Sequence, residues 1–250
     1  MGIMVGIACC VGNKRAVATA ESEPTGIMTF ADPAMQALCA KTWGDGTNIT
    51  YEQAREVTEI PKNWAKDNTA ITSFNEIKYF KNLLYIRDAA FNGCSSMALT
   101  SLELPQCTSI GRDAFYRCSS MALTSLDLPQ CTSIGEGAFS GCSSMALTSL
   151  EIPQCTSIGR DAFYGCKSMK SIELPSTMTS IGAAAFQYCT GLIRVSIAAD
   201  TPPTLGSSAF ANCPALTGIY VPDDSVEAYK TATNWSAYAN KILPLSQFNG

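Results

Sequence analysis

The sequence contains no histidine among its 250 residues. This removes the commonest general base of enzymes, the Ser-His and Cys-His nucleophile pairs, and every metal site that needs an imidazole ligand. Charged residues are also scarce, at 15% of the chain, compared with about 25% in an average soluble protein. Most classes of catalytic site are therefore disfavoured, and we predict a protein that is not an enzyme and holds no cofactor.

Positive charge and long apolar runs are lacking as well. The net charge is −4, which excludes a basic nucleic-acid footprint and argues against binding to an anionic membrane. No apolar run approaches the roughly 20 residues that span a bilayer. Residues 3–11 are apolar, but no Lys or Arg precedes them as in a signal peptide. We therefore expect residues 1–28 to be an irregular tail or the remnant of an export segment.

What the sequence does have is an internal repeat. An Ala-Phe pair recurs every 23 or 24 residues, at Phe91, Phe115, Phe139, Phe163, Phe186 and Phe210. A cysteine follows three residues after each of these rings, at Cys94, Cys118, Cys142, Cys166, Cys189 and Cys213. Each unit also carries an apolar-x-apolar segment, such as Leu102-Glu103-Leu104, and five of the units carry an apolar-Gly step, such as Ile110-Gly111.

A period of this length with a Leu-x-Leu core is typical of a leucine-rich-repeat solenoid. One unit cannot bury its apolar face alone, but stacked units place equivalent side chains about 4.8 Å apart. The outer residues of each Leu-x-Leu segment then point inward and the middle residue points outward. We predict six stacked units over residues 86–222, each with a short strand. The predicted inward residues are Leu102, Leu104, Phe115, Leu126, Leu128, Phe139, Leu150, Ile152, Phe163, Ile172, Leu174 and Phe186.

The Ser-Ile-Gly-x-x-Ala-Phe-x-x-Cys motif at residues 133–142, with its Leu-x-Leu-Pro strands, resembles the BspA-like (Treponema pallidum-type) leucine-rich repeat. The resemblance covers about residues 71–222. It implies an α+β repeat fold, a solenoid of about six units between helical caps. It also implies a bacterial, non-enzymatic protein, at the cell surface or secreted, that adheres to a protein partner such as a host matrix or other cell-surface protein. A structural spacer or stalk and a calcium- or carbohydrate-binding module remain the alternatives.

The flanks predict four segments. After the tail at 1–28 we expect a helical N-terminal cap over 29–70, the solenoid over 71–222 and a C-terminal helical cap over 223–250. In the first cap, one helix should run from Asp32 or Pro33 to about Lys41 and another over 51–57. In the second, a helix should begin at Asp224 or Ser225. Such caps cover the core faces that the end units of a solenoid expose.

The loop at 43–50 is similar to a degenerate EF-hand loop. If Asp45 is the fifth position of such a loop, Lys41 and Trp43 occupy the first and third ligand positions. A calcium loop needs oxygen ligands there. We therefore expect no metal site and interpret this region as a helix-turn-helix cap.

The twelve cysteines do not form metal-binding pairs. Those of the repeat are 23 or 24 residues apart, as are Cys107, Cys131 and Cys155, whereas metal sites usually use Cys-x-x-Cys pairs. We predict reduced, buried thiols that pack as small apolar side chains. Three further cysteines lie outside the ladder and are candidates for reactive thiols: Cys9, Cys10 and Cys39.

Two surfaces are candidates for binding. The outward strand positions form a mostly acidic strip of Glu103, Asp127, Glu151, Glu173, Ser196 and Tyr220. A second, aromatic and basic patch comprises Arg112, Tyr116, Arg160 and Tyr164. Either set is also compatible with an ordinary solvated surface. A retaining glycosidase needs two carboxylates about 5–5.5 Å apart in unequal environments and in a pocket, which a flat strand face does not provide.

Overall fold

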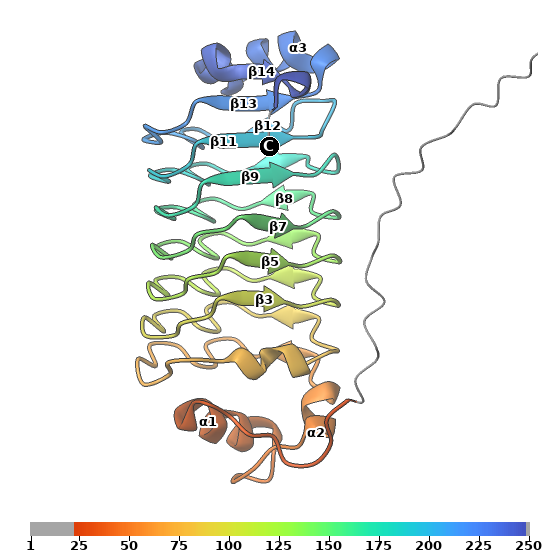
Figure 1. Cartoon of the computed structure of the whole chain (residues 1–250), viewed down its shortest axis with the longest axis vertical. Helices are drawn as coiled ribbons and strands as arrows, with labels where there is room; N and C mark the ends of the chain where they lie inside the picture. Colours follow the sequence, from red (N-terminus) through yellow and green to blue (C-terminus); the bar gives the residue numbers. More distant parts are fainter. Residues whose placement is uncertain (1–22, 249–250) are drawn as a thin grey trace, which may run out of the picture.

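The structure is a computed structural model that describes residues 23–248. Figure 1 shows a stack of similar coils, closed by helices at both ends. The fold is a leucine-rich-repeat solenoid, as predicted. Each central coil contributes two short parallel strands, one to each of two sheets on different sides of the stack.

The strands predicted from the Leu-x-Leu segments are all present, but they form two sheets. One is the three-stranded sheet β3 (Ser101–Glu103), β5 (Ser125–Asp127) and β7 (Ser149–Glu151). The other contains β9 (Ser171–Leu174), β11 (Arg194–Ile197), β13 (Gly218–Val221) and β14 (Ile242–Pro244). The break falls between β7 and β9, where Ile172 follows Leu150 by 22 residues instead of 24. The shorter connection disturbs the register that hydrogen bonding between the two strands needs.

A seven-stranded parallel sheet on the other side of the coils was not predicted. Its strands are β1 (Glu59–Ile60), β2 (Tyr85–Ile86), β4 (Ser109–Ile110), β6 (Ser133–Ile134), β8 (Ser157–Ile158), β10 (Ser180–Ile181) and β12 (Thr204–Leu205). Each strand is only two residues long, too short for a period-two pattern. Threonine hydroxyls reinforce the sheet: Thr132 Oγ1 donates to the carbonyl of Thr108 at 3.2 Å, and Thr156 Oγ1 to that of Thr132 at 3.1 Å.

Glycine follows each strand of this sheet except the first two, because the preceding coil lies so close. A Cβ added to Gly135 would meet the carbonyl carbon of Gly111 at 2.7 Å, and one added to Gly159 would meet the backbone nitrogen of Glu136 at 2.5 Å. Any larger residue would push neighbouring coils apart. This contact is the physical reason for the repeated apolar-Gly step.

The core is a column of phenylalanine rings that runs the length of the stack. Adjacent rings, from Phe91 to Phe210, are nearly parallel, with centroids 5.1–5.4 Å apart. Eleven of the twelve predicted inward residues are buried. The exception is Leu150, which is only partly buried. It lies on β7 at the sheet break, where a strand pairs with β7 on the β5 side only.

The N-terminal cap contains α1 (Pro33–Trp43), α2 (Tyr51–Glu56) and the 3-10 helix η1 (Asn75–Tyr79). Asp32 is the N-cap of α1, at the position predicted, and the helix continues two residues beyond Lys41. The long sheet already begins at Glu59, within the range predicted for the cap. Trp64 and Phe74 close this end of the core, with ring centroids 5.7 and 6.0 Å from that of Phe91.

The C-terminal cap comprises η2 (Asp223–Ser225), α3 (Val226–Thr231), η3 (Trp235–Lys241) and η4 (Leu245–Gln247). Trp235 is fully buried against Phe210, with ring centroids 6.1 Å apart. Its indole Nε1–H donates to the carbonyl of Pro203 at 2.7 Å. The last coil is thereby sealed from water. Among residues 23–248, no helix has the length and apolar character that a membrane crossing requires.

Candidate interaction surfaces

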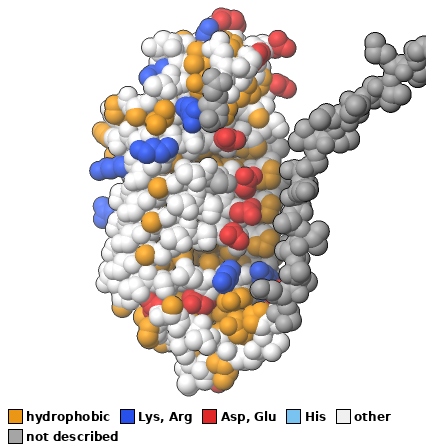
Figure 2. All heavy atoms as spheres, viewed as in Figure 1, with side chains coloured by type: hydrophobic (Ala, Val, Ile, Leu, Met, Phe, Trp, Pro, Cys, Tyr) orange, Lys and Arg blue, Asp and Glu red, His pale blue; other side chains and the backbone are white. Residues whose placement is uncertain are grey.

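The acidic strip runs along the short strands of β3, β5 and β7. Strand register places Glu103 beside Asp127 and Asp127 beside Glu151. Figure 2 shows acidic side chains in a line along the stack. Glu103 and Asp127 form no ion pair with any residue of the described range 23–248. Their charge is therefore directed to solvent or to a partner.

The carboxylates of the strip affect one another. Partial burial raises the pKa of Asp127 above its usual value, and the charges of Glu103 and Glu151 raise it further. A negative group flanked by two others gains from a nearby positive charge. The strip is therefore a locally negative surface.

The six outward residues were expected to form one strip, but the structure interrupts it. At the sheet break a small hollow of about 90 Å³ separates β7 from β9, with Glu151 and Glu173 on its lining. Ser196 is only 8% exposed and contributes no surface. Tyr220 is partly covered by Phe248, whose ring centroid lies 5.0 Å away. The usable surface is therefore four acidic residues that flank a break.

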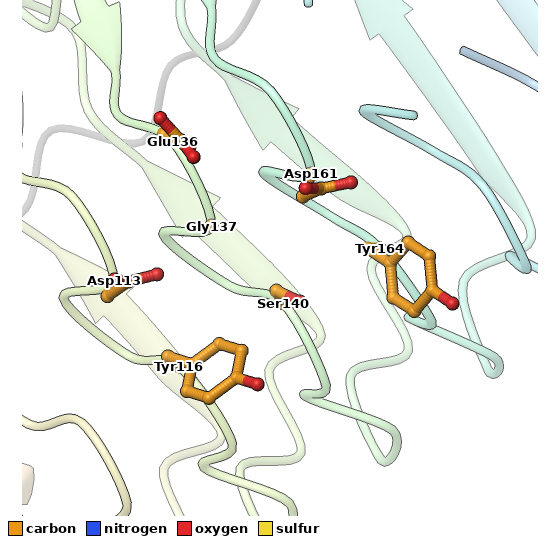
Figure 3. A pocket seen from close by; sticks show the side chains of 7 residues that line it. All are labelled: Asp113, Tyr116, Glu136, Gly137, Ser140, Asp161 and Tyr164. Carbon is orange, nitrogen blue, oxygen red and sulfur yellow. The ribbon is translucent and has the colours of Figure 1, made fainter. Parts of the chain in front are cut away.

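The second predicted patch divides into two parts. Tyr116 and Tyr164 line a pocket of about 230 Å³ together with Ser140, which lies between them on the middle coil (Figure 3). Arg112 and Arg160 do not line it. Instead, they form ion pairs with the three acidic residues that line the pocket, which are Asp113, Glu136 and Asp161.

Ser140 and the three acidic residues of this pocket were not predicted from the sequence. A signal was present. The three central units are nearly identical, and the middle one departs from both neighbours around this point, with Glu136-Gly137 in place of Arg-Asp and Ser140 in place of Tyr. Such a difference is meaningful only once stacking is known to place the three units side by side.

Comparison with known proteins gives the family. The profile described as "BspA type Leucine rich repeat region" matches in six copies, over residues 67–146 and 108–238. The chain belongs to the BspA-type leucine-rich-repeat family. Proteins with this repeat are typically surface and interaction proteins. No curated protein matches the chain.

Three solved structures are similar to this BspA-type protein. A T. pallidum leucine-rich repeat protein is 27% identical with a TM-score of 0.47, over 56% of this chain and 65% of that one. A leucine-rich cell surface protein from Faecalibacterium prausnitzii is 29% identical with a TM-score of 0.46, over 61% and 45%. A leucine-rich repeat protein from Bacteroides ovatus is 25% identical with a TM-score of 0.49, over 66% and 40%. The matched region spans less than two thirds of each relative.

The cysteines of this BspA-type protein are buried, as predicted. All ten that the structure describes are free thiols. The sequence did not indicate their hydrogen bonds. The thiol three residues after each ring of the phenylalanine column donates to a backbone carbonyl of the preceding coil. Cys142 Sγ lies 3.1 Å from the oxygen of Phe115, and Cys166 Sγ lies 3.3 Å from that of Phe139. Cys39 is fully buried, which contradicts its candidacy as a reactive thiol. Cys9 and Cys10 lie outside the described residues.

We expect the described cysteines to resist thiol reagents in the folded protein. Burial raises the pKa of Cys94 and of Cys213 to about 11, and the pKa of Cys107 to about 12. At pH 8 a thiol with a pKa near 11 is ionised in only about one molecule in a thousand. Titration with Ellman's reagent should therefore label none of the ten rapidly, and all ten after unfolding without reductant. Failure to recover these thiols on unfolding would contradict the prediction.

The loop of Asp45 is held by its own backbone. One carboxylate oxygen of Asp45 accepts from the N–H groups of Thr47 at 2.8 Å and Asn48 at 2.6 Å. These hydrogen bonds, chiefly that from Asn48, lower the pKa of the Asp45 carboxyl. Within residues 23–248, no three Cys, Asp or Glu residues converge into a group able to hold a metal ion.

We therefore expect calorimetric titration with calcium chloride to give no micromolar binding. The loop has too few oxygen ligands, because Lys41 and Trp43 occupy the earlier ligand positions. Micromolar binding that Asp45→Ala abolishes would refute this expectation.

Proposed function

We propose that this protein is a non-enzymatic cell-surface or secreted interaction protein. In this proposal it binds a basic protein partner, in the manner of an adhesin, through the face that carries Glu103, Asp127, Glu151 and Glu173. The solenoid is the interaction module, and the segments before and after it are caps. The observation that supports this function best is the register of three carboxylates on neighbouring exposed strands.

Several features favour a partner over a plain solvated face. Like charges on neighbouring strands repel. The pKa of Asp127 is raised first by partial burial and then by the charges of Glu103 and Glu151. A basic surface laid across the strip would relieve this repulsion. The face is also extended, which is how solenoids commonly meet their partners. The hollow at the sheet break makes the surface concave between Glu151 and Glu173.

A rigid spacer or stalk would need none of these groups. It would require only the stacked core and the caps. The acidic strip therefore separates the two functions in an experiment, because its removal leaves the core unchanged.

We expect replacement of the four acids by serine to slow association with the partner about tenfold or more at low salt. The purified chain is first screened against an array of matrix and cell-surface proteins. Association rates are then measured by surface plasmon resonance across a range of sodium chloride concentrations. The wild type should weaken as salt rises, because the Debye length falls to about 8 Å at physiological ionic strength.

The matched control removes the same charge elsewhere, by changing Glu56, Asp200, Asp224 and Glu227 to serine. All four are exposed and lie off the strip. This control should retain most of the association rate. If the strip variant binds with unchanged affinity and unchanged salt dependence, the partner does not use this face. If no array protein binds the wild type, the spacer function is favoured.

A further inference from the structure

The pocket between Tyr116 and Tyr164 exists because one coil has smaller side chains than its neighbours. The residue after the core phenylalanine is tyrosine in the coils on either side and Ser140 in the middle. The backbone is unchanged: Asp113, Gly137 and Asp161 all have φ between 53° and 63°. The hollow therefore arises from side-chain size alone.

Ser140 forms the floor of this pocket. Its residue is only 6% exposed, and its hydroxyl has no hydrogen-bond partner among residues 23–248. The Ser140 oxygen is not among the enclosed polar atoms that lack a partner, so it is open to the pocket that Ser140 lines. The Ser140 side chain lines the pocket between Tyr116 and Tyr164 (Figure 3). It is therefore available to a ligand that enters the pocket.

The two tyrosines are fixed by neighbours that do not line the pocket. The guanidinium of Arg117 lies 5.0 Å from the ring centroid of Tyr116. The ring of Tyr188 lies 5.3 Å from that of Tyr164, at 65°. Preformed aromatic walls lower the ordering cost of binding.

The rim of the pocket carries both acceptors and donors, with three carboxylates against two guanidinium groups. Arg112 Nε lies 3.4 Å from Asp113 and its Nη2 lies 3.8 Å from Glu136, while Arg160 Nε lies 3.1 Å from Asp161. Each of these carboxylates lies within 4 Å of a guanidinium, which weakens its attraction for a free cation. An anion meets three carboxylates on the lining. The chemistry suits a neutral ligand with many hydroxyl groups.

We propose that this pocket binds one sugar ring of a neutral glycan. The apolar C–H faces of the ring pack on Tyr116 and Tyr164. Its hydroxyls donate to the carboxylates of Asp113, Glu136 and Asp161 and accept from the Ser140 hydroxyl or from the rim arginines. A volume of about 230 Å³ matches a single ring, so the affinity for one sugar is on the order of millimolar. This site is separate from the acidic strip and does not depend on the function proposed for it.

The test uses the full chain and an array of neutral oligosaccharides, followed by saturation-transfer NMR titration of each glycan that binds. Ser140→Tyr restores the residue of both flanking coils and fills the hollow. It should fold normally and bring binding below detection. The matched control, Gln187→Tyr, adds the same ring in the same column outside the pocket and should bind as the wild type. Ser140→Ala, which keeps the hollow open, should weaken binding several-fold.

The proposal is overturned if no neutral oligosaccharide binds. It is also overturned if a bound glycan is unaffected by Ser140→Tyr, or if a pocket-dependent ligand proves to be an arginine-containing peptide. The two proposals are distinguished by crossing the variants. The serine substitutions on the acidic strip should leave glycan binding unchanged, and Ser140→Tyr should leave protein binding unchanged.

Discussion

Phe139→Ala should lower the free energy of unfolding by about 3–5 kcal/mol. Phe139 is fully buried in the middle of the ring column, with centroids 5.3 Å from Phe115 and 5.4 Å from Phe163. Truncation leaves a cavity between two rings that are themselves held in place, so the coils cannot collapse to fill it. Chemical denaturation followed by far-ultraviolet circular dichroism measures the loss.

Two control variants define the cause. Phe139→Leu keeps most of the volume and should cost less than the alanine variant. Tyr188→Ala removes a ring that is 41% exposed and should change stability by only about 0.5 kcal/mol. A loss below about 1 kcal/mol for Phe139→Ala would mean that the stacked column contributes little to stability.

Asp32→Ala should lower the free energy of unfolding by about 3 kcal/mol, because five buried or partly buried donors lose their acceptor. One carboxylate oxygen of Asp32 accepts from the N–H groups of Ala34 and Met35 at 2.8 and 2.9 Å, at the first turn of α1. The other accepts from the N–H and the hydroxyl of Thr72 and from the N–H of Ser73. This single side chain joins the capping helix to the irregular first coil.

The same residue should make stability depend on acid. Burial alone would raise the pKa of Asp32, but the hydrogen bonds from Thr72, Met35 and Ser73 outweigh it and lower the pKa from 3.8 to about 2. Because the folded-state pKa is the lower one, the contribution is fully present above pH 3.8 and is lost as pH falls through about 2. The difference amounts to about 2 kcal/mol at neutral pH.

Denaturation midpoints measured between pH 7 and pH 2 check this expectation. Asp32→Ala should flatten the acid limb of the profile, whereas Asp224→Ala, at an exposed position, should not. An unchanged acid limb in the Asp32 variant would show that other carboxylates cause the acid sensitivity.

The fold was predictable from the sequence where one residue type recurs at the same position of every repeat. The ring column, the cysteine ladder and the first strand of each coil all repeat every 23 or 24 residues, and identical units can bury identical faces only by stacking. The start of α1 was also predictable, because Asp32-Pro33 is a strong N-terminal signal. The second sheet was missed, since a strand of two residues has no period to detect.

The surfaces were less predictable than the core. The break after β7 coincides with a spacing of 22 residues, instead of 24, between Leu150 and Ile172. In the sequence alone, this difference is only a small irregularity of the repeat. Ser196 occupies an outward position in the pattern and is nonetheless buried in the structure. The pocket at Ser140 needs three coils at once, because its walls come from the units before and after the one that forms its floor.

The sequence by itself therefore determined the family, the stacking of the units and the inward residues. A repeated apolar pattern is buried when each unit stacks on the next, so that equivalent side chains contact one another. Only the tertiary structure decided which outward residues form a surface. Exposure depends on what the adjacent coil and the caps cover, and those neighbours are about 24 residues or more away along the chain. Tyr220 behind Phe248 and Ser140 between two tyrosines owe their exposure to that packing.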